Sequence, residues 1–175
     1  MFHRTQRLFL RPAWPEDWEA IYRGICDEGV VRNLARAPWP YEPEHARDWA
    51  KRPLDPSSPT WLITLADSGE LVGCIGIDPH DGEVEVGYWI ARAHWAKGFA
   101  TEAGQAVLEI ARMMGHARLV ASHYVDNPAS GRVLRKLGFL PTGKTENRMS
   151  MGRGEKVQAT AYVLNLDTTE SLRAA

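Results

Sequence analysis

A loop rich in small residues joins an expected strand to an expected helix at Trp95–Ala103 (WAKGFATEA). The first N–H groups of a helix have no partner within the helix, and the helix dipole adds positive charge there. Gly98 permits close approach of a ligand to the backbone, and Lys97 supplies a cation. We therefore expect a phosphate or pyrophosphate site built from Ala96, Lys97, Gly98, Phe99, Ala100 and Thr101. An ordinary helix start would show the same pattern.

A second polar segment, Asn127–Phe139 (NPASGRVLRKLGF), predicts another helix. Asn127 suits an N-cap, and Pro128 suits the first helical position. Ser130 begins an apolar stripe with i, i+3, i+4, i+7 spacing, so its hydroxyl is expected to point inward. The alternative is a hydroxyl bonded to the first turn of its own helix. Tyr124, on the preceding strand, is a second candidate hydroxyl.

Glu85 is the candidate general base. Strand alternation places Glu85 on one face of the expected strand Val84–Ile90, opposite a strand that carries His123. A carboxylate there suits removal of a proton from an ammonium group, directly or through water, and His123 acting through water is the alternative. A solvated strand face would show the same alternation. No His, Cys, Asp or Glu group has ligand spacing, so we expect no metal.

The composition indicates one globular domain. The chain has 175 residues, 25% of them charged, and a net charge of −1. We expect a single domain over residues 1–167 and a frayed polar tail over 168–175. Cys26 and Cys74 belong to no metal or redox motif, and no segment is apolar for long enough to span a bilayer. A cytoplasmic protein with neither nucleic acid nor membrane as a partner is therefore expected.

Charge is distributed unevenly along the chain. Residues 1–87 contain 9 Lys and Arg against 15 Asp and Glu, whereas residues 88–175 contain 12 against 7. An acidic half beside a basic half would suit a protein that brings a cation and a polyanion together. Chance scatter of solvated charges is the alternative.

Hydrophobic periodicity, caps and turn residues predict a mixed α/β chain, with an antiparallel meander in front and β-α-β units behind. Strands are expected at Arg7–Arg11, Trp61–Leu65, Leu71–Ile77, Val84–Ile90, Arg118–Val125 and Gln158–Leu166. Helices are expected from Pro15, at Val30–Leu34 and Pro43–Lys51, from Ala100 to Met114, and from Pro128 to Gly138. Two prolines exclude a helix at Ala37–Tyr41, which we interpret as a loop with exposed aromatic side chains.

Taken together, these segments resemble the GNAT superfamily of acyl-CoA-dependent N-acetyltransferases. The resemblance is carried by the Trp95–Ala103 loop and by N-P-x-S-x-x-V-L-x-K-L-G-F at Asn127–Phe139. T-x-R-L-x-L-R-P at Thr5–Pro12 and E-x-G-Y-W at Glu85–Trp89 are similar to the RimJ/RimL-type branch, which acetylates protein N-terminal amines. Ala96 stands where a glycine is common in the superfamily.

The resemblance implies an α/β fold with a central, mostly antiparallel twisted sheet of about seven strands and helices on both faces. Two strands would splay apart, with the pantetheine arm of the coenzyme in the gap and a bulge at Gly87. Ile90 and Ala91 would offer their backbone to pantetheine, and residues 96–101 would bind the pyrophosphate. Asn127 would bond the arm or act only as an N-cap. Ser130, or else Tyr124, would donate to the coenzyme sulfur.

The function that follows is transfer of an acetyl group from acetyl-CoA to a primary amine by direct attack in a ternary complex. Deprotonating the ammonium group at pH 7, to give the neutral amine that attacks, costs about 1 kcal/mol for an α-amine but about 4.6 kcal/mol for a lysine. A protein or peptide N-terminus is therefore favoured. Small-molecule amines and a non-catalytic acyl-CoA-binding role are the alternatives. Trp39, Tyr41 and Glu85 are the candidate acceptor contacts, and a homodimer is left open.

Overall fold

The computed structural model describes residues 1–166, so the tail expected at 168–175 lies outside the described residues. The strands are β1 (His3–Arg4), β2 (Leu8–Arg11), β3 (Thr60–Leu65), β4 (Leu71–His80), β5 (Glu83–Ile90), β6 (Arg118–Tyr124), β7 (Leu140–Ser150) and β8 (Glu155–Asn165). The helices are α1 (Trp18–Ile25), α2 (Glu28–Val31), α3 (Pro43–Ala50), α4 (Phe99–Met113) and α5 (Pro128–Lys136), with 3-10 turns at Pro15–Asp17 and Arg92–His94.

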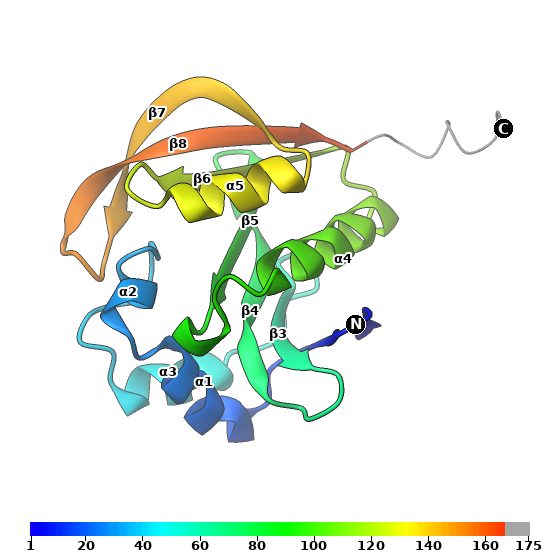
Figure 1. The fold of residues 1–175 in the computed structure, drawn as a ribbon, viewed down its shortest axis with the longest axis vertical. Helices are drawn as coiled ribbons and strands as arrows, with labels where there is room; N and C mark the ends of the chain where they lie inside the picture. The colour runs from blue at the N-terminus through cyan, green and yellow to red at the C-terminus, as the bar shows by residue number, and fades with distance from the viewer. Residues whose placement is uncertain (167–175) are drawn as a thin grey trace, which may run out of the picture.

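All eight strands lie in one sheet, in the order β1-β2-β3-β4-β5-β6-β8-β7 (Figure 1). Each neighbouring pair is antiparallel except β5 and β6, which run parallel. β5 and β6 pair at a single register position, Glu85 opposite Val120. From there the strands run toward Ile90 and Tyr124 with no further pairing between their described residues. The expected splay is therefore present, and it divides the sheet into two halves.

Helices cover both faces of the sheet, as expected. On one face, α4 and α5 contribute Val107, Ile110 and Leu134 to a core that includes Ile75 and Val86 of the sheet. The other face carries a second core, formed by the α1–α3 segment against alternate residues of β3, β4 and β5. No helix among residues 1–166 combines the length and hydropathy needed to cross a bilayer.

Two strands of the sheet were not expected from the sequence. β1 is only two residues long, and the first eight residues of β7 are exposed, so neither shows an apolar alternation. β7 is a strand because it pairs with β8, from Leu140 opposite Val163 to Ser150 opposite Glu155. With the six strands expected from the sequence, β1 and β7 make eight within residues 1–166, where the resemblance implied about seven.

The expected bulge at Gly87 is absent. The β4–β5 register runs without a shift from Gly73 opposite Ile90 to His80 opposite Glu83, and Gly87 lies opposite Gly76 within it. A Cβ added at Gly87 would meet nothing within 4 Å. The glycine therefore leaves open space on its face of β5 rather than bending the strand.

Candidate active site

The loop expected to bind phosphate lies at the N-terminus of α4, directly after β5 and the turn Arg92–His94. Gly98 is the N-cap residue and adopts the left-handed conformation, with φ 81° and ψ 2°. Within the described part of the chain, no side chain caps this helix. The first-turn N–H groups of α4 are therefore left for an external acceptor. An anion fits this place, because the helix dipole favours negative charge there.

Ala96 also has a positive φ, 61°, which is uncommon for a residue with a side chain. Two left-handed residues, Ala96 and Gly98, thus flank Lys97 and give the loop its sharp turn. Glycine adopts a positive φ without steric cost, which explains why it is common at the position of Ala96 in the superfamily that this sequence resembles.

The gap between β5 and β6 presents fewer free backbone groups than expected. The Ala91 N–H donates to the Val72 carbonyl at 2.8 Å, and the Ala91 carbonyl accepts from the His94 N–H at 2.9 Å. The Ile90 carbonyl accepts from the Trp95 indole at 2.6 Å. Because alternate residues of a strand point their N–H groups to opposite edges, the Ile90 N–H is directed into the gap. Ile90 thus offers a donor there, whereas the backbone of Ala91 is already bonded within the protein.

Two hydroxyl groups meet beside this gap. Ser130 Oγ of α5 lies 2.8 Å from the Tyr88 hydroxyl of β5, so the alternative contact with its own helix is not the one formed. Burial raises the pKa of Tyr88 to about 12, which keeps this phenol protonated. If the Tyr88 hydroxyl donates to Ser130, the Ser130 proton is free for another acceptor. Sequence reasoning missed Tyr88, although strand alternation already placed it on the same face as Val86 and Ile90.

Tyr124 and Asn127 have partners within the protein. The Tyr124 hydroxyl donates to the Met149 carbonyl at 2.7 Å, so its proton is already used. The Asn127 side-chain oxygen accepts from the Ser130 N–H at 3.4 Å, which confirms the N-cap. Of the two candidate donors to sulfur, Ser130 is therefore the one whose proton is free for an outside acceptor when Tyr88 donates to it.

Glu85 forms a partly buried ion pair instead of facing solvent. Arg148 Nη2 donates to Glu85 Oε2 at 2.8 Å, and Arg148 Nη1 donates to Glu85 Oε1 and to Ser122 Oγ. The Ser122 hydroxyl also donates to Glu85 Oε1, at 3.1 Å. The hydrogen bonds to Glu85 raise the pKa of Arg148. Arg148 was missed because its segment has no apolar pattern, and only the pairing of β7 brings it here.

His123 does not join Glu85. Ser122, which contacts Glu85, and His123 are consecutive in β6 and therefore project to opposite faces. The His123 Nδ1–H donates to the Tyr124 carbonyl at 2.8 Å, and Nε2 lies 3.3 Å from the Tyr162 hydroxyl. Glu85 and His123, the two alternative candidate bases, therefore lie on opposite faces of the sheet.

The two aromatic residues of the loop Ala37–Tyr41 differ in exposure. Trp39 is 39% exposed, as expected, but Tyr41 is only 5% exposed. Burial raises the pKa of Tyr41 to about 12. The expectation that Tyr41 is exposed is therefore wrong, because this side chain packs into the core beneath α1–α3.

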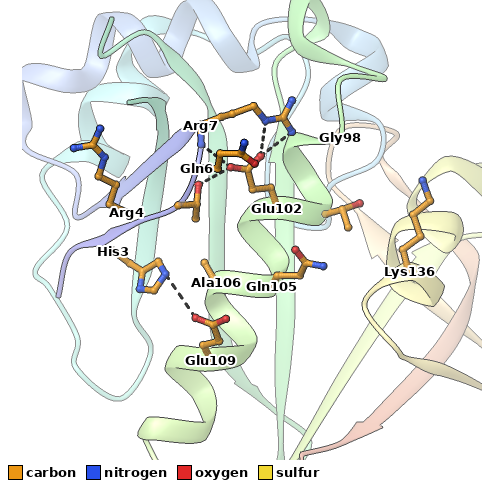
Figure 2. Close-up of a pocket in the computed structure, with 12 residues that line it drawn as sticks. His3, Arg4, Gln6, Arg7, Gly98, Glu102, Gln105, Ala106, Glu109 and Lys136 are labelled. Atoms are coloured by element: carbon orange, nitrogen blue, oxygen red, sulfur yellow. Dashed lines mark hydrogen bonds and ion pairs between the residues drawn. The ribbon is translucent and has the colours of Figure 1, made fainter. Parts of the chain in front are cut away.

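An open pocket of about 640 Å³ borders the N-terminal half of α4 (Figure 2). Arg4 and Arg7 line one side and Lys136 the other, with Gly98 and Thr101 of the loop between them. A ligand bound at the loop would thus have room there, beside basic side chains and beside the carboxylates of Glu102 and Glu109. No group of three or more potential metal ligands occurs among residues 1–166.

Comparison with known proteins shows similarity to acetyltransferases. The acetyltransferase (GNAT) domain model matches residues 7–140. The uncharacterized N-acetyltransferase YoaA of Bacillus subtilis is 31% identical over an alignment of 151 residues, and the match covers 79% of this chain and 82% of that protein. The ribosomal-protein-serine acetyltransferase of Escherichia coli is 35% identical over 103 residues, covering 57% of this chain and 52% of that protein.

The fold is also similar to that of a solved coenzyme complex. RimL, a ribosomal-protein alpha-N-acetyltransferase solved with coenzyme A, superposes with a TM-score of 0.77 at 19% identity. The match covers 96% of this chain and 99% of that chain.

The left-handed conformation of Ala96 leads to a stability prediction. A side chain in this region costs about 1–2 kcal/mol, and glycine costs about 0.5–1 kcal/mol of extra chain entropy. Ala96→Gly should therefore be neutral or stabilising by up to about 1 kcal/mol, raising Tm by roughly 2–4 °C. Ala100→Gly, two residues into the helix, is the matched control and should lower Tm. Thermal unfolding of both variants tests this, and an Ala96→Gly loss equal to that of the control would contradict it.

Proposed function

The chain belongs to the GNAT acetyltransferase family and is an N-acetyltransferase, and we propose that it acetylates the α-amine of a protein or peptide N-terminus with acetyl-CoA as donor. The observation that carries this proposal is the uncapped first turn of α4 beside the gap between β5 and β6. The N-terminus of α4 suits the pyrophosphate of acetyl-CoA. The gap between β5 and β6 suits the extended pantetheine arm of the same ligand. The proposed compartment is the cytoplasm.

Acetyl-CoA would be held mainly by backbone groups. Residues 96–101 would bind the pyrophosphate, and the Ile90 N–H would lie beside the arm and its thioester. A donor directed to the thioester oxygen stabilises the charge that develops there during attack. In support, RimL was solved with coenzyme A and has this fold.

The reaction needs one bond formed and one broken. The neutral amine attacks the thioester carbonyl carbon, the C–N bond forms, and the C–S bond breaks to release the coenzyme thiolate. Ser130, supported by the Tyr88 hydroxyl 2.8 Å away, would donate to the sulfur as negative charge gathers on it. Glu85 would accept the proton that the amine nitrogen loses, directly or through water.

The surroundings of Glu85 favour an amine of low pKa. Both carboxylate oxygens already accept hydrogen bonds from Arg148, so fewer acceptor sites are left for an incoming ammonium group. A substrate that is already partly neutral at pH 7 places the least demand on such a base. An α-amine, with a pKa of about 7.7–8.0, meets this condition better than lysine at about 10.4. The ribosomal-protein-serine acetyltransferase of E. coli, 35% identical over its matched part, points the same way.

The proposed substrate class is tested by thiol release from acetyl-CoA. Peptides with a free N-terminus should be acetylated, and the same peptides with a blocked N-terminus and a free lysine should not. Mass spectrometry would locate the acetyl group on the α-nitrogen. Polyamines and free amino acids serve as small-molecule controls. A higher kcat/KM for a polyamine or a free amino acid than for every peptide would overturn the N-terminal assignment.

Ser130→Ala should lower kcat at least about tenfold, equivalent to about 1.4 kcal/mol of barrier. The contact strengthens only as charge develops on sulfur, so the Kd for acetyl-CoA should stay within about twofold. Tyr88→Phe should show a smaller loss of the same kind. Single-turnover kinetics and calorimetry separate the two effects. A silent Ser130→Ala together with an impaired Tyr124→Phe would transfer the donor role to Tyr124.

Glu85→Gln should lower kcat at pH 7 and lose less at pH 9, where an α-amine is mostly neutral without help. Arg148→Gln provides the comparison, because it breaks the same ion pair but leaves the carboxylate. It should keep most of its activity at neutral pH. Rate profiles from pH 6.5 to 9.5 measure both variants. Equal, pH-independent losses would show that the pair is only structural and would end the general-base assignment.

A further inference from the structure

Thr5 and Arg7, in the segment before β2, bind Glu102 of the first turn of α4, and Figure 2 shows the Arg7–Glu102 contact. Glu102 Oε1 accepts from Thr5 Oγ1 at 2.6 Å and from the Arg7 N–H at 2.8 Å. Glu102 Oε2 accepts from Arg7 Nε at 2.7 Å. The proposed reaction uses none of these residues, although T-x-R-L begins the motif at Thr5–Pro12 that is similar to the RimJ/RimL-type branch.

Arg7 also reaches the phosphate-binding loop itself. Its Nη1 donates to the Lys97 carbonyl at 3.1 Å. Its guanidinium lies 4.7 Å from the centroid of the Phe99 ring, where a cation is attracted by the ring face. The planar Arg7 side chain therefore bridges Lys97 and Glu102, which lie on either side of the left-handed Gly98 in the sequence.

The direction of the Lys97 carbonyl controls the direction of the next N–H. In a planar trans peptide, the C=O of Lys97 and the N–H of Gly98 point in opposite directions. Glycine adopts positive and negative φ values about equally well. Gly98 by itself therefore does little to prevent the Lys97–Gly98 peptide from flipping. A flipped peptide would turn a carbonyl oxygen, instead of an N–H, toward a bound anion.

We propose that Arg7 is a positioning residue for coenzyme binding, which holds the Lys97–Gly98 peptide with its N–H directed to the pyrophosphate by tying the Lys97 carbonyl to Glu102. This inference rests on the proposed function. The guanidinium suits the task because its donors are held in a rigid plane, whereas a lysine ammonium is a point charge on a flexible stem. Burial acts to raise the pKa of Glu102, but the bonds from Thr5 and Arg7 outweigh it and lower that pKa, so the carboxylate stays charged near neutrality.

β2 offers a matched control for a purely structural role. Arg11 forms a bidentate pair with Asp17, both bonds at 2.7 Å, and its guanidinium lies 4.3 Å from the Trp14 ring centroid. This pair has the same chemistry as the Arg7–Glu102 pair but contacts no residue of the loop. Its loss should affect stability alone.

The experiment is calorimetric titration of the full chain with acetyl-CoA, together with thermal unfolding and kcat at saturating acetyl-CoA. Arg7→Ala should raise Kd about tenfold while kcat at saturation stays within about twofold. Arg7→Lys should raise Kd at least about threefold, because it keeps the charge but not the planar donors. Glu102→Gln should also weaken binding, and Arg11→Ala should lower Tm with Kd unchanged.

Specific outcomes would overturn the inference. If Arg7 acted only as a counter-charge, Arg7→Lys would bind like the parent and Glu102→Gln would bind acetyl-CoA more tightly. A counter-charge would also make the Kd of Arg7→Ala less dependent on salt than that of the parent, whereas a positioning role leaves this dependence unchanged. A lowered Tm with unchanged Kd in Arg7→Ala would reduce Arg7 to a structural residue. Failure of the parent protein to bind acetyl-CoA would instead refute the proposed function, so the two failures are distinguishable.

Discussion

The single parallel contact between β5 and β6 determines much of the remaining structure. An otherwise antiparallel sheet is joined at its centre by one register position, Glu85 opposite Val120, and opens beyond it. A gap in a sheet leaves backbone donors and acceptors without partners, and such groups are costly unless they are solvated or bonded. The protein bonds one of them internally, because the Ile90 carbonyl accepts from the Trp95 indole. The Ile90 N–H is left facing the gap, where an extended ligand would meet it.

The two faces of the sheet at this gap differ in chemistry. The face under α4 and α5 presents backbone donors and neutral hydroxyls, including Tyr88 and Ser130. The opposite face presents the Glu85–Arg148 pair with Ser122. A coenzyme rich in phosphate suits the first face, and an amine that must lose a proton suits the second. The gap would let the two reactants meet while keeping the polyanion apart from the Glu85 carboxylate.

The hairpin of β7 and β8 is what completes the second face. Its turn packs on the segment after α2, where the Met151 N–H donates to the Ala35 carbonyl at 3.1 Å and Ser150 Oγ donates to the Leu34 carbonyl at 3.3 Å. This docking and the pairing with β8 fix the direction of β7, so that Arg148 reaches across to Glu85. A mostly exposed strand thus supplies a partly buried charge to the candidate active site.

The sequence alone determined the elements that local chemistry specifies. The uncapped, glycine-containing start of α4 and the Asn-Pro start of α5 could be read directly, because caps and helix breakers act within a few residues. Alternation in β5 also predicted the face of Glu85. Tertiary structure alone decided its partner Arg148, the Tyr88–Ser130 contact, the burial of Tyr41 and the existence of β7. Each of these depends on hydrogen bonds or packing between segments far apart in the chain, and such contacts leave no periodic pattern in the residues that make them.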